Sequence, residues 1–153
     1  MENGAKLFVR GVALITILLA VALGAGFAQT DPIAARRELM KANGRYSKLG
    51  SDMVRGKVRF DLGKAKAMFD SFIEAGNKLP DLFPENSQTG GETSASPEIW
   101  THWDDVKARF AKFAANAKAA QDATKDLGTF RAGFRTLSED CDSCHERYRL
   151  KKG

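Results

Sequence analysis

The sequence predicts an all-α protein whose helices pack together as a bundle. Apolar residues recur at steps of three and four in four segments of the chain, which is the spacing of one helix face. No stretch alternates polar and apolar residues for long enough to predict a strand. A helix with a single apolar seam buries that seam by packing against other helices. Four such segments therefore predict a four-helix bundle.

The first 28 residues differ from the rest and are predicted to be a cleaved secretory signal peptide. Lys6 and Arg10 precede an uncharged apolar run at 12–23, and the small residues Gly24, Ala25, Gly26 and Ala28 follow. The run is shorter than the roughly 20 residues that span a bilayer, which disfavours the alternative of an uncleaved membrane anchor. We expect cleavage after Ala28, export to the periplasm of a bacterium, and a mature domain of residues 29–153.

The first helix is predicted from Pro32 to about Arg55. Asp31 supplies a capping carboxylate, and proline suits the first helical position. Its apolar face is marked by residues seven apart, namely Leu39, Tyr46 and Met53.

The second helix is predicted from about Asp61 to Lys78, and Pro80 ends it. Its apolar positions are Ala65, Phe69 and Phe72. Residues 80–96 are rich in Pro, Gly, Ser and Thr and have no helical period, which predicts a long loop.

The third and fourth helices carry the clearest apolar stripes. Ser96 and Pro97 begin the third helix, and a break near 124–128 separates it from the fourth. The third stripe is Ile99, Trp103, Val106, Phe110, Phe113, Ala117 and Ala120. The fourth stripe is Phe130, Phe134, Leu137, Cys141, Cys144 and Tyr148. Steps that alternate four and three are typical of a helix buried along one seam.

The charge of the mature chain is modestly positive. Residues 29–153 hold 22 Lys and Arg residues and 18 Asp and Glu residues, a net charge of +4. These charges are spread along the sequence, so we expect a solvated, mildly basic surface with no nucleic-acid footprint. An excess of this sign could also favour an acidic docking partner. We expect no nucleic-acid partner, and no membrane span after cleavage.

The most specific motif is Cys-Asp-Ser-Cys-His at residues 141–145, the C-x-x-C-H signature of c-type haem attachment. Each thiol can add across a haem vinyl group to form a thioether. Cys141 and Cys144 lie one helical turn apart, and His145 follows Cys141 by four residues on nearly the same face. One helix can therefore present two covalent anchors and the proximal iron ligand. The motif predicts one covalent haem c.

Other uses of a Cys-x-x-Cys pair fit the sequence less well. A thioredoxin-like redox pair belongs on a βαβ framework, which the pattern lacks. A zinc site needs a fourth strong ligand, and His102 is the only other histidine. A structural disulfide is the third alternative, but cysteines one turn apart in a helix are poorly placed for one.

Four segments of the chain together resemble the cytochrome c′ family, the class II c-type cytochromes. They are RRELMKANGR (36–45), LPDLFP (79–84), SPEIW (96–100) and CDSCHERYR (141–149). The resemblance covers essentially the whole mature chain, and the haem motif near the C-terminus is its most specific element. It implies an antiparallel up-down-up-down four-helix bundle with the haem in the core near the last helix. Dimers are common in this family, so the resemblance also implies a possible homodimer.

The resemblance assigns the second axial ligand to Met40, which falls where the family's distal residue projects toward the iron. Members with leucine or phenylalanine there are five-coordinate and bind nitric oxide or carbon monoxide. Members with methionine there look six-coordinate and low-spin. The resemblance therefore implies the low-spin, methionine-ligated branch, with His145 and Met40 on the iron. The alternative for Met40, as for Met53 and Met68, is core packing.

Two arginines acquire roles from the same resemblance. Arg36 matches an arginine near the haem propionates, and Arg149 matches a basic position beside the proximal histidine. The alternatives are a solvated face of the first helix for Arg36 and an exposed C-terminal tail for Arg149. A distal ligand from His102 is the weakest possibility, because that residue lies beside the apolar stripe of the third helix.

These features predict a periplasmic one-electron carrier that uses His/Met-ligated haem c and exchanges electrons with other redox proteins. Such a protein transforms no substrate and is not an enzyme. The alternative is a haem protein, five-coordinate or with a displaceable ligand, that binds nitric oxide or carbon monoxide.

Overall fold

The computed structural model describes residues 31–151, and the segment predicted as a signal peptide lies outside the described residues. The described part contains five α-helices, which are α2 (Pro32–Val54), α3 (Leu62–Lys78), α4 (Glu98–Thr101), α5 (Trp103–Ala123) and α6 (Leu127–Tyr148). No helix within this part is long and apolar enough to cross a membrane.

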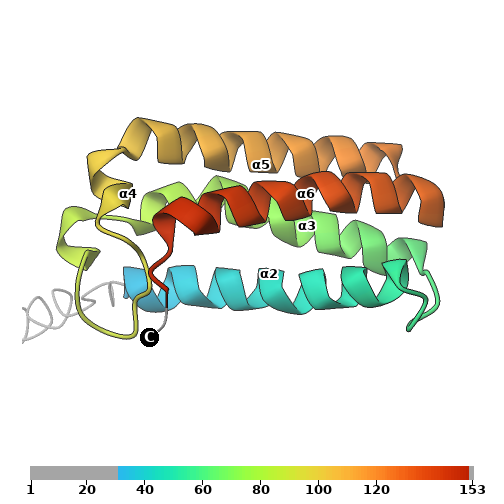
Figure 1. The fold of residues 1–153 in the computed structure, drawn as a ribbon, viewed down its shortest axis with the longest axis horizontal. Helices are drawn as coiled ribbons and strands as arrows, with labels where there is room; N and C mark the ends of the chain where they lie inside the picture. Colours follow the sequence, from blue (N-terminus) through green and yellow to red (C-terminus); the bar gives the residue numbers. More distant parts are fainter. Residues whose placement is uncertain (1–30, 152–153) are drawn as a thin grey trace, which may run out of the picture. The chain divides into compact units, whose positions relative to one another are not determined.

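The four long helices form an antiparallel bundle, which confirms the predicted fold class. In Figure 1, α2 and α5 run in one direction and α3 and α6 in the other. Helix α3 packs extensively on α5, and α5 packs on α6. Among neighbouring long helices, α2 and α6 share the fewest contacts. The bundle is therefore least tightly closed along the edge between α2 and α6.

Aspartate caps begin three of the long helices. Asp31 Oδ1 accepts the backbone N–H two residues on at 2.9 Å, and Asp61 Oδ1 accepts the N–H three residues on at 2.8 Å. Asp126 and Thr129 form a reciprocal capping box at the start of α6. Each cap satisfies a backbone donor that has no partner inside its helix.

The third predicted helix is divided, which corrects the prediction of one continuous helix there. His102 leaves helical geometry, with φ −120° and ψ 39°, between α4 and α5. On either side of this interruption Trp100 and Trp103 pack on Phe83, with ring centroids 5.8 and 6.1 Å apart. Trp100 Nε1 also donates to the Phe83 carbonyl at 3.0 Å. Contacts with a distant loop accompany the break, and a local apolar pattern contains no information about them.

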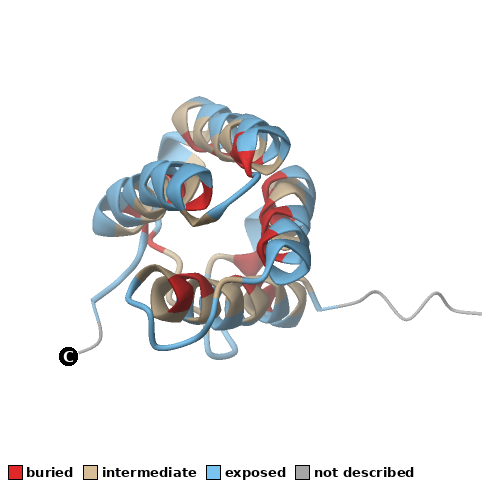
Figure 2. Ribbon diagram, turned by 90° about the vertical axis from the view of Figure 1, so that its right-hand side faces the viewer, coloured by how far each residue is buried: buried red, intermediate tan, exposed pale blue. Residues whose placement is uncertain are grey.

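The core forms two clusters along the bundle. The first contains the fully buried side chains of Met53, Met68, Phe69, Phe72 and Phe130. The second contains Leu79, Ile99, Val106, Phe110 and Tyr148. Figure 2 shows that buried residues face the interior enclosed by the four long helices. Met40 and Cys144 pack against the second cluster but are only partly buried, and both line a cavity.

Two glycines let α5 approach its neighbours closely. A Cβ on Gly133 of α6 would lie 2.6 Å from the Ala120 Cβ. A Cβ on Gly76 of α3 would lie 2.8 Å from the Ala114 Cβ. Both separations are far too short for carbon atoms, so these crossings require glycine. They hold α3, α5 and α6 together in a tight set of three helices.

Candidate haem-attachment site

A cavity of about 1360 Å³ opens between α2, α5 and α6, bordered by the loop before α4 and the residues after α6. It exceeds the about 300–1,000 Å³ of most small-molecule pockets. Its apolar lining includes Leu79, Phe83, Ile99, Val106, Phe110 and Phe113. This size and lining suit a large cofactor that is mostly apolar.

All six residues predicted to form the site line this one cavity. They are Arg36, Met40, Cys141, Cys144, His145 and Arg149. They come from α2, α6 and the first residue after α6, and 100 residues (41–140) lie between Met40 and the motif. His102, the only other histidine of the chain, is not part of the lining.

Helix α6 presents the two cysteines on the cavity wall as free, partly buried thiols. Burial, reinforced by the carboxylates of Asp142 and Asp140, raises the pKa of Cys141 from 9.0 to about 11. Burial also raises the pKa of Cys144. Before attachment both groups are therefore protonated thiols near neutral pH, one helical turn apart on the same wall.

His145 lies on the same wall, one residue beyond Cys144. Burial lowers the pKa of His145, and the positive charge of Arg149 lowers it further. The imidazole is therefore neutral near neutral pH, and a neutral imidazole keeps one ring nitrogen available as a metal ligand.

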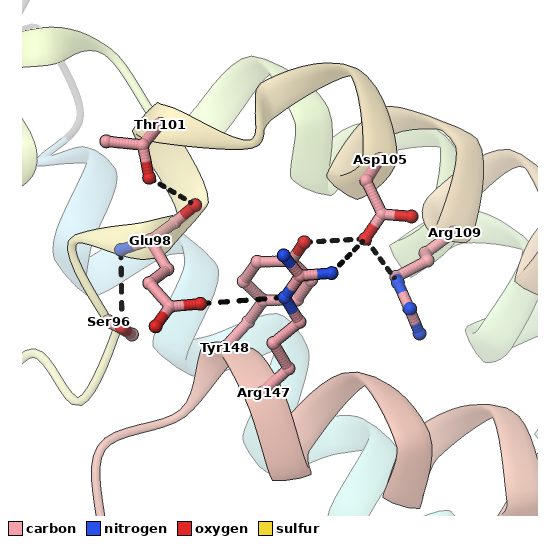
Figure 3. A network of polar contacts seen from close by, with 7 residues as sticks. All are labelled: Ser96, Glu98, Thr101, Asp105, Arg109, Arg147 and Tyr148. Atoms are coloured by element: carbon pink, nitrogen blue, oxygen red, sulfur yellow. Dashed lines mark hydrogen bonds and ion pairs between the residues drawn. The ribbon is translucent and has the colours of Figure 1, made fainter.

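A polar network, which the sequence did not reveal, fixes the last turn of α6 (Figure 3). Asp105 Oδ2 accepts the Tyr148 hydroxyl at 2.5 Å and the Arg109 Nε–H at 2.8 Å. Arg147 lies 3.7 Å from the same oxygen and 3.5 Å from Glu98. We call Asp105, Arg109, Arg147 and Tyr148 the Asp105 network. It joins the turn that carries the predicted proximal ligand to the first turns of α5.

Main-chain hydrogen bonds hold the end of the same helix. The Ser96 N–H donates to the Tyr148 carbonyl at 2.9 Å, beside an isolated antiparallel bridge between Ala95 and Arg149. The Arg149 N–H donates to the His145 carbonyl at 3.2 Å. Arg149 is exposed and lies one turn beyond the histidine. Burial is the larger cause of the lowered pKa of His145, and the nearby charge of Arg149 adds to it.

Helix α2 brings one methionine to the cavity. Met40 is partly buried in the cavity lining, whereas Met53 and Met68 are fully buried in the first core cluster. Gly44, one turn after Met40, also lines the cavity, and a Cβ built there would meet nothing within 4 Å. Helical periodicity gives the same alternative, core packing, for all three methionines of residues 31–151. In the structure Met53 and Met68 are core residues, and Met40 lines the cavity.

Arg36 is buried, with 4% of its surface exposed, so the alternative of a solvated helix face is wrong. Its Nη1 donates to the Leu82 carbonyl at 3.0 Å and to Ser87 Oγ at 2.9 Å. Its Nη2 donates to the Ser87 carbonyl at 2.8 Å and to Thr93 Oγ1 at 2.7 Å. The guanidinium carbon also lies 4.8 Å from the centre of the Phe83 ring. Arg36 therefore anchors the long loop to α2 at the cavity border.

The donors in this cavity fit an iron porphyrin held by two thioethers. Two thiols and a neutral imidazole share one wall, a thioether comes from another helix, and the remaining walls are largely apolar. Within residues 31–151, no three His, Cys, Asp or Glu side chains are grouped so that they alone could hold a metal ion. A four-helix bundle with this site near its C-terminal end defines a c-type cytochrome of the bundle class.

Comparison with known proteins identifies the family. The family described as Cytochrome C′ matches residues 31–149. This chain belongs to the cytochrome c′ family, the class II c-type cytochromes, whose members carry one covalently bound haem c.

The relatives include proteins named cytochrome c′ and proteins named cytochrome c-556. A cytochrome c′ from Rhodopseudomonas palustris is 40% identical over 144 residues, covering 91% of this chain and 97% of the relative. A cytochrome c-556 from Agrobacterium fabrum is 35% identical over 130 residues, covering 78% of this chain and 86% of the relative. The solved structure of Rhodopseudomonas palustris cytochrome c′ matches with a TM-score of 0.79 and 38% identity, over 82% of this chain and 100% of that chain.

Proposed function

We propose that this protein is a periplasmic one-electron carrier in which His145 and Met40 are the axial ligands of the haem iron. When bound, the haem supplies a ferric–ferrous couple whose potential a methionine ligand raises. Cys141 and Cys144 hold the group covalently, and His145 binds iron from the same helix. The observation that carries the proposal is that Met40 lines the cavity while Met53 and Met68 lie in the core.

The remaining residues of the site hold these ligands in place. The Asp105 network and the bridge at Ala95 restrain the last turn of α6, and Arg36 restrains the long loop. Fixed ligands keep the reorganisation that accompanies electron transfer small, and apolar walls limit the entry of water. No substrate bond is made or broken in this function, so we propose a carrier and not an enzyme.

Arg36 and Arg149 have secondary roles in the proposal. The four hydrogen bonds of Arg36 use both terminal nitrogens, and its charge at the cavity border favours a nearby haem propionate. Arg149 lowers the pKa of His145 by its charge, and a positive charge beside that ligand also favours the ferrous state over the ferric state.

The cellular setting is also part of the proposal. Residues 1–28 act as a signal peptide, residues 29–153 form the exported protein, and other periplasmic redox proteins are its partners. The homodimer implied by the family resemblance remains a prediction.

A second candidate function is the binding of nitric oxide or carbon monoxide with Met40 displaced from the iron. The position of Met40 favours this candidate, because its side chain is only partly buried at the border of the cavity and is not locked in the core.

Matched substitutions of two methionines test the axial assignment. We expect Met40→Leu to change a low-spin absorption spectrum into a high-spin one, because leucine keeps the volume but cannot bind iron. Met53→Leu is the control, since Met53 is fully buried away from the cavity, and we expect it to keep the low-spin spectrum. An unchanged spectrum in Met40→Leu would rule out Met40 as a ligand.

A further inference from the structure

The positive charge of the chain is concentrated around the cavity. Seven basic residues line the cavity, against three acidic ones. The rest of residues 31–151 holds 14 basic and 15 acidic residues, so it is close to neutral. Charges that are spread along the sequence are therefore brought together around the cavity by the fold. The basic lining residues are Arg36, Arg37, Lys41, Arg109, Lys112, Arg149 and Lys151.

Most of these basic groups reach solvent. The side chains of Lys41 and Lys112 are 53% and 67% exposed, and Arg149 and Lys151 are exposed as well. They come from α2, α5 and the segment after α6, so they surround the opening from separate parts of the fold. Arg36 is the exception, because it is buried under the long loop.

Ion pairing does not remove the excess. The three acidic lining residues, Glu92, Asp105 and Asp140, pair with Arg37, Arg109 and Lys112. The seven basic lining residues therefore exceed the three acidic ones by four. Lys41 also contacts Glu38, but this is a pair of exposed side chains on one helix and is weak in water. The two propionate carboxylates of a bound haem would halve the excess without changing its sign.

We propose that the exposed part of this surface, the basic rim formed by Lys41, Lys112, Arg149 and Lys151, docks an acidic one-electron carrier protein. The inference rests on the proposed function and specifies the chemistry of the partner. A positive patch on an otherwise neutral molecule steers an acidic protein to that patch and to no other face. Docking there brings the partner's redox centre to the opening of the cavity. One electron then passes from the reduced partner to the ferric protein, and no bond is formed or broken.

The test uses the haem-loaded protein and a reduced plant-type [2Fe–2S] ferredoxin as an acidic protein donor. Its potential of about −400 mV makes electron transfer to the ferric protein favourable. Stopped-flow absorbance gives the bimolecular rate constant from about 10 mM salt, where the Debye length is about 30 Å, to about 1 M, where it is about 3 Å. We expect the rate constant of the unmodified protein to fall at least tenfold over this range.

Charge reversals at and away from the rim locate the docking site. We expect Lys41→Glu and Lys151→Glu each to lower the rate constant roughly 3- to 10-fold at low salt. At high salt we expect the rate constants of both variants to approach that of the unmodified protein. The control is Lys118→Glu, because Lys118 is 58% exposed, pairs only within α5 and does not line the cavity. We expect this variant to stay within about twofold of the unmodified protein.

Three results would overturn the docking proposal. The first is a rate constant that does not depend on salt, and the second is an equal decrease of the rate constant in all three variants. The third is binding of the unmodified protein to anionic lipid vesicles through the rim, together with a reaction with ferredoxin that does not respond to salt. Failure of the proposed function is separate from these results. A high-spin, carbon monoxide-binding spectrum of the unmodified protein would contradict that function whatever the salt dependence.

Discussion

Asp105 shows how one carboxylate can fix a functional turn. The Tyr148 hydroxyl and Arg109 both bind its ionised form, and they hold the pKa of Asp105 below its ordinary 3.8. A carboxyl group whose pKa is lowered in the folded state stabilises the fold above its unfolded-state pKa. That contribution is lost as the pH falls through the lower, folded-state value.

The loss of stability caused by Asp105→Asn is therefore expected to depend on pH. We expect the variant to have a lower free energy of unfolding than the unmodified protein at about pH 7, with the difference shrinking below about pH 3.8, the ordinary value for this carboxyl. Denaturant unfolding of the haem-loaded protein at about pH 7 and about pH 3 measures the difference. Asp122→Asn is the control, because Asp122 pairs with Lys118 inside α5 and makes no ion pair with α6. An equal effect of Asp105→Asn at both pH values would contradict this role.

Single residues differ in how far the sequence could predict their roles. Cys141, Cys144 and His145 could be proposed at once, because covalent attachment and ligation require a fixed spacing within one helix. The loop-anchoring role of Arg36 could not be predicted, because its hydrogen-bond partners lie 46 to 57 residues away. Asp105 was missed for the same reason, since Tyr148 follows it by 43 residues.

At the scale of helices, local signals predicted most boundaries. The first helix was expected from Pro32 to about Arg55 and ends at Val54, because its cap and apolar spacing are local features. The break at His102 was not predicted, because it accompanies contacts of two tryptophans with Phe83. The close approach of α5 and α6 was not predicted either, because Gly133 has no side chain and adds nothing to the apolar pattern of the helix.

Gly133→Ala tests that close approach. The added methyl group would lie 2.6 Å from the Ala120 Cβ, so the helices must move apart. We expect a loss of about 1–3 kcal/mol in the free energy of unfolding, the usual cost of overpacking a core. Chemical denaturation measures the loss.

The matched control for this prediction is Gly128→Ala in the same helix. A Cβ there would have an ordinary contact of 3.4 Å with the side chain of Asp126 and would face no other helix. We expect little change or a gain of up to about 1 kcal/mol, because alanine restricts the unfolded chain. Equal losses in the two variants would show that helix crossing is not the cause.

At the scale of the whole molecule, folding converts scattered residues into one cavity with a basic rim. The sequence predicted the bundle and the family, because seams and motifs are visible in a linear pattern. It could not predict the concentration of charge, because the basic lining residues lie between positions 36 and 151 and meet only in the fold. The cavity lined by Met40 and the haem motif lies where α2 and α6 share few contacts, and this is where we propose that the partner docks.

The measurement that most directly tests the central claim is the absorption spectrum of the ferrous, haem-loaded protein before and after the addition of carbon monoxide. If His145 and Met40 both bind the iron, the spectrum is low-spin and six-coordinate, and it changes little on mixing because no position on the iron is open. Rapid, stoichiometric formation of a carbon monoxide complex would contradict this assignment. It would show instead that Met40 leaves the distal position of the iron open to a gas.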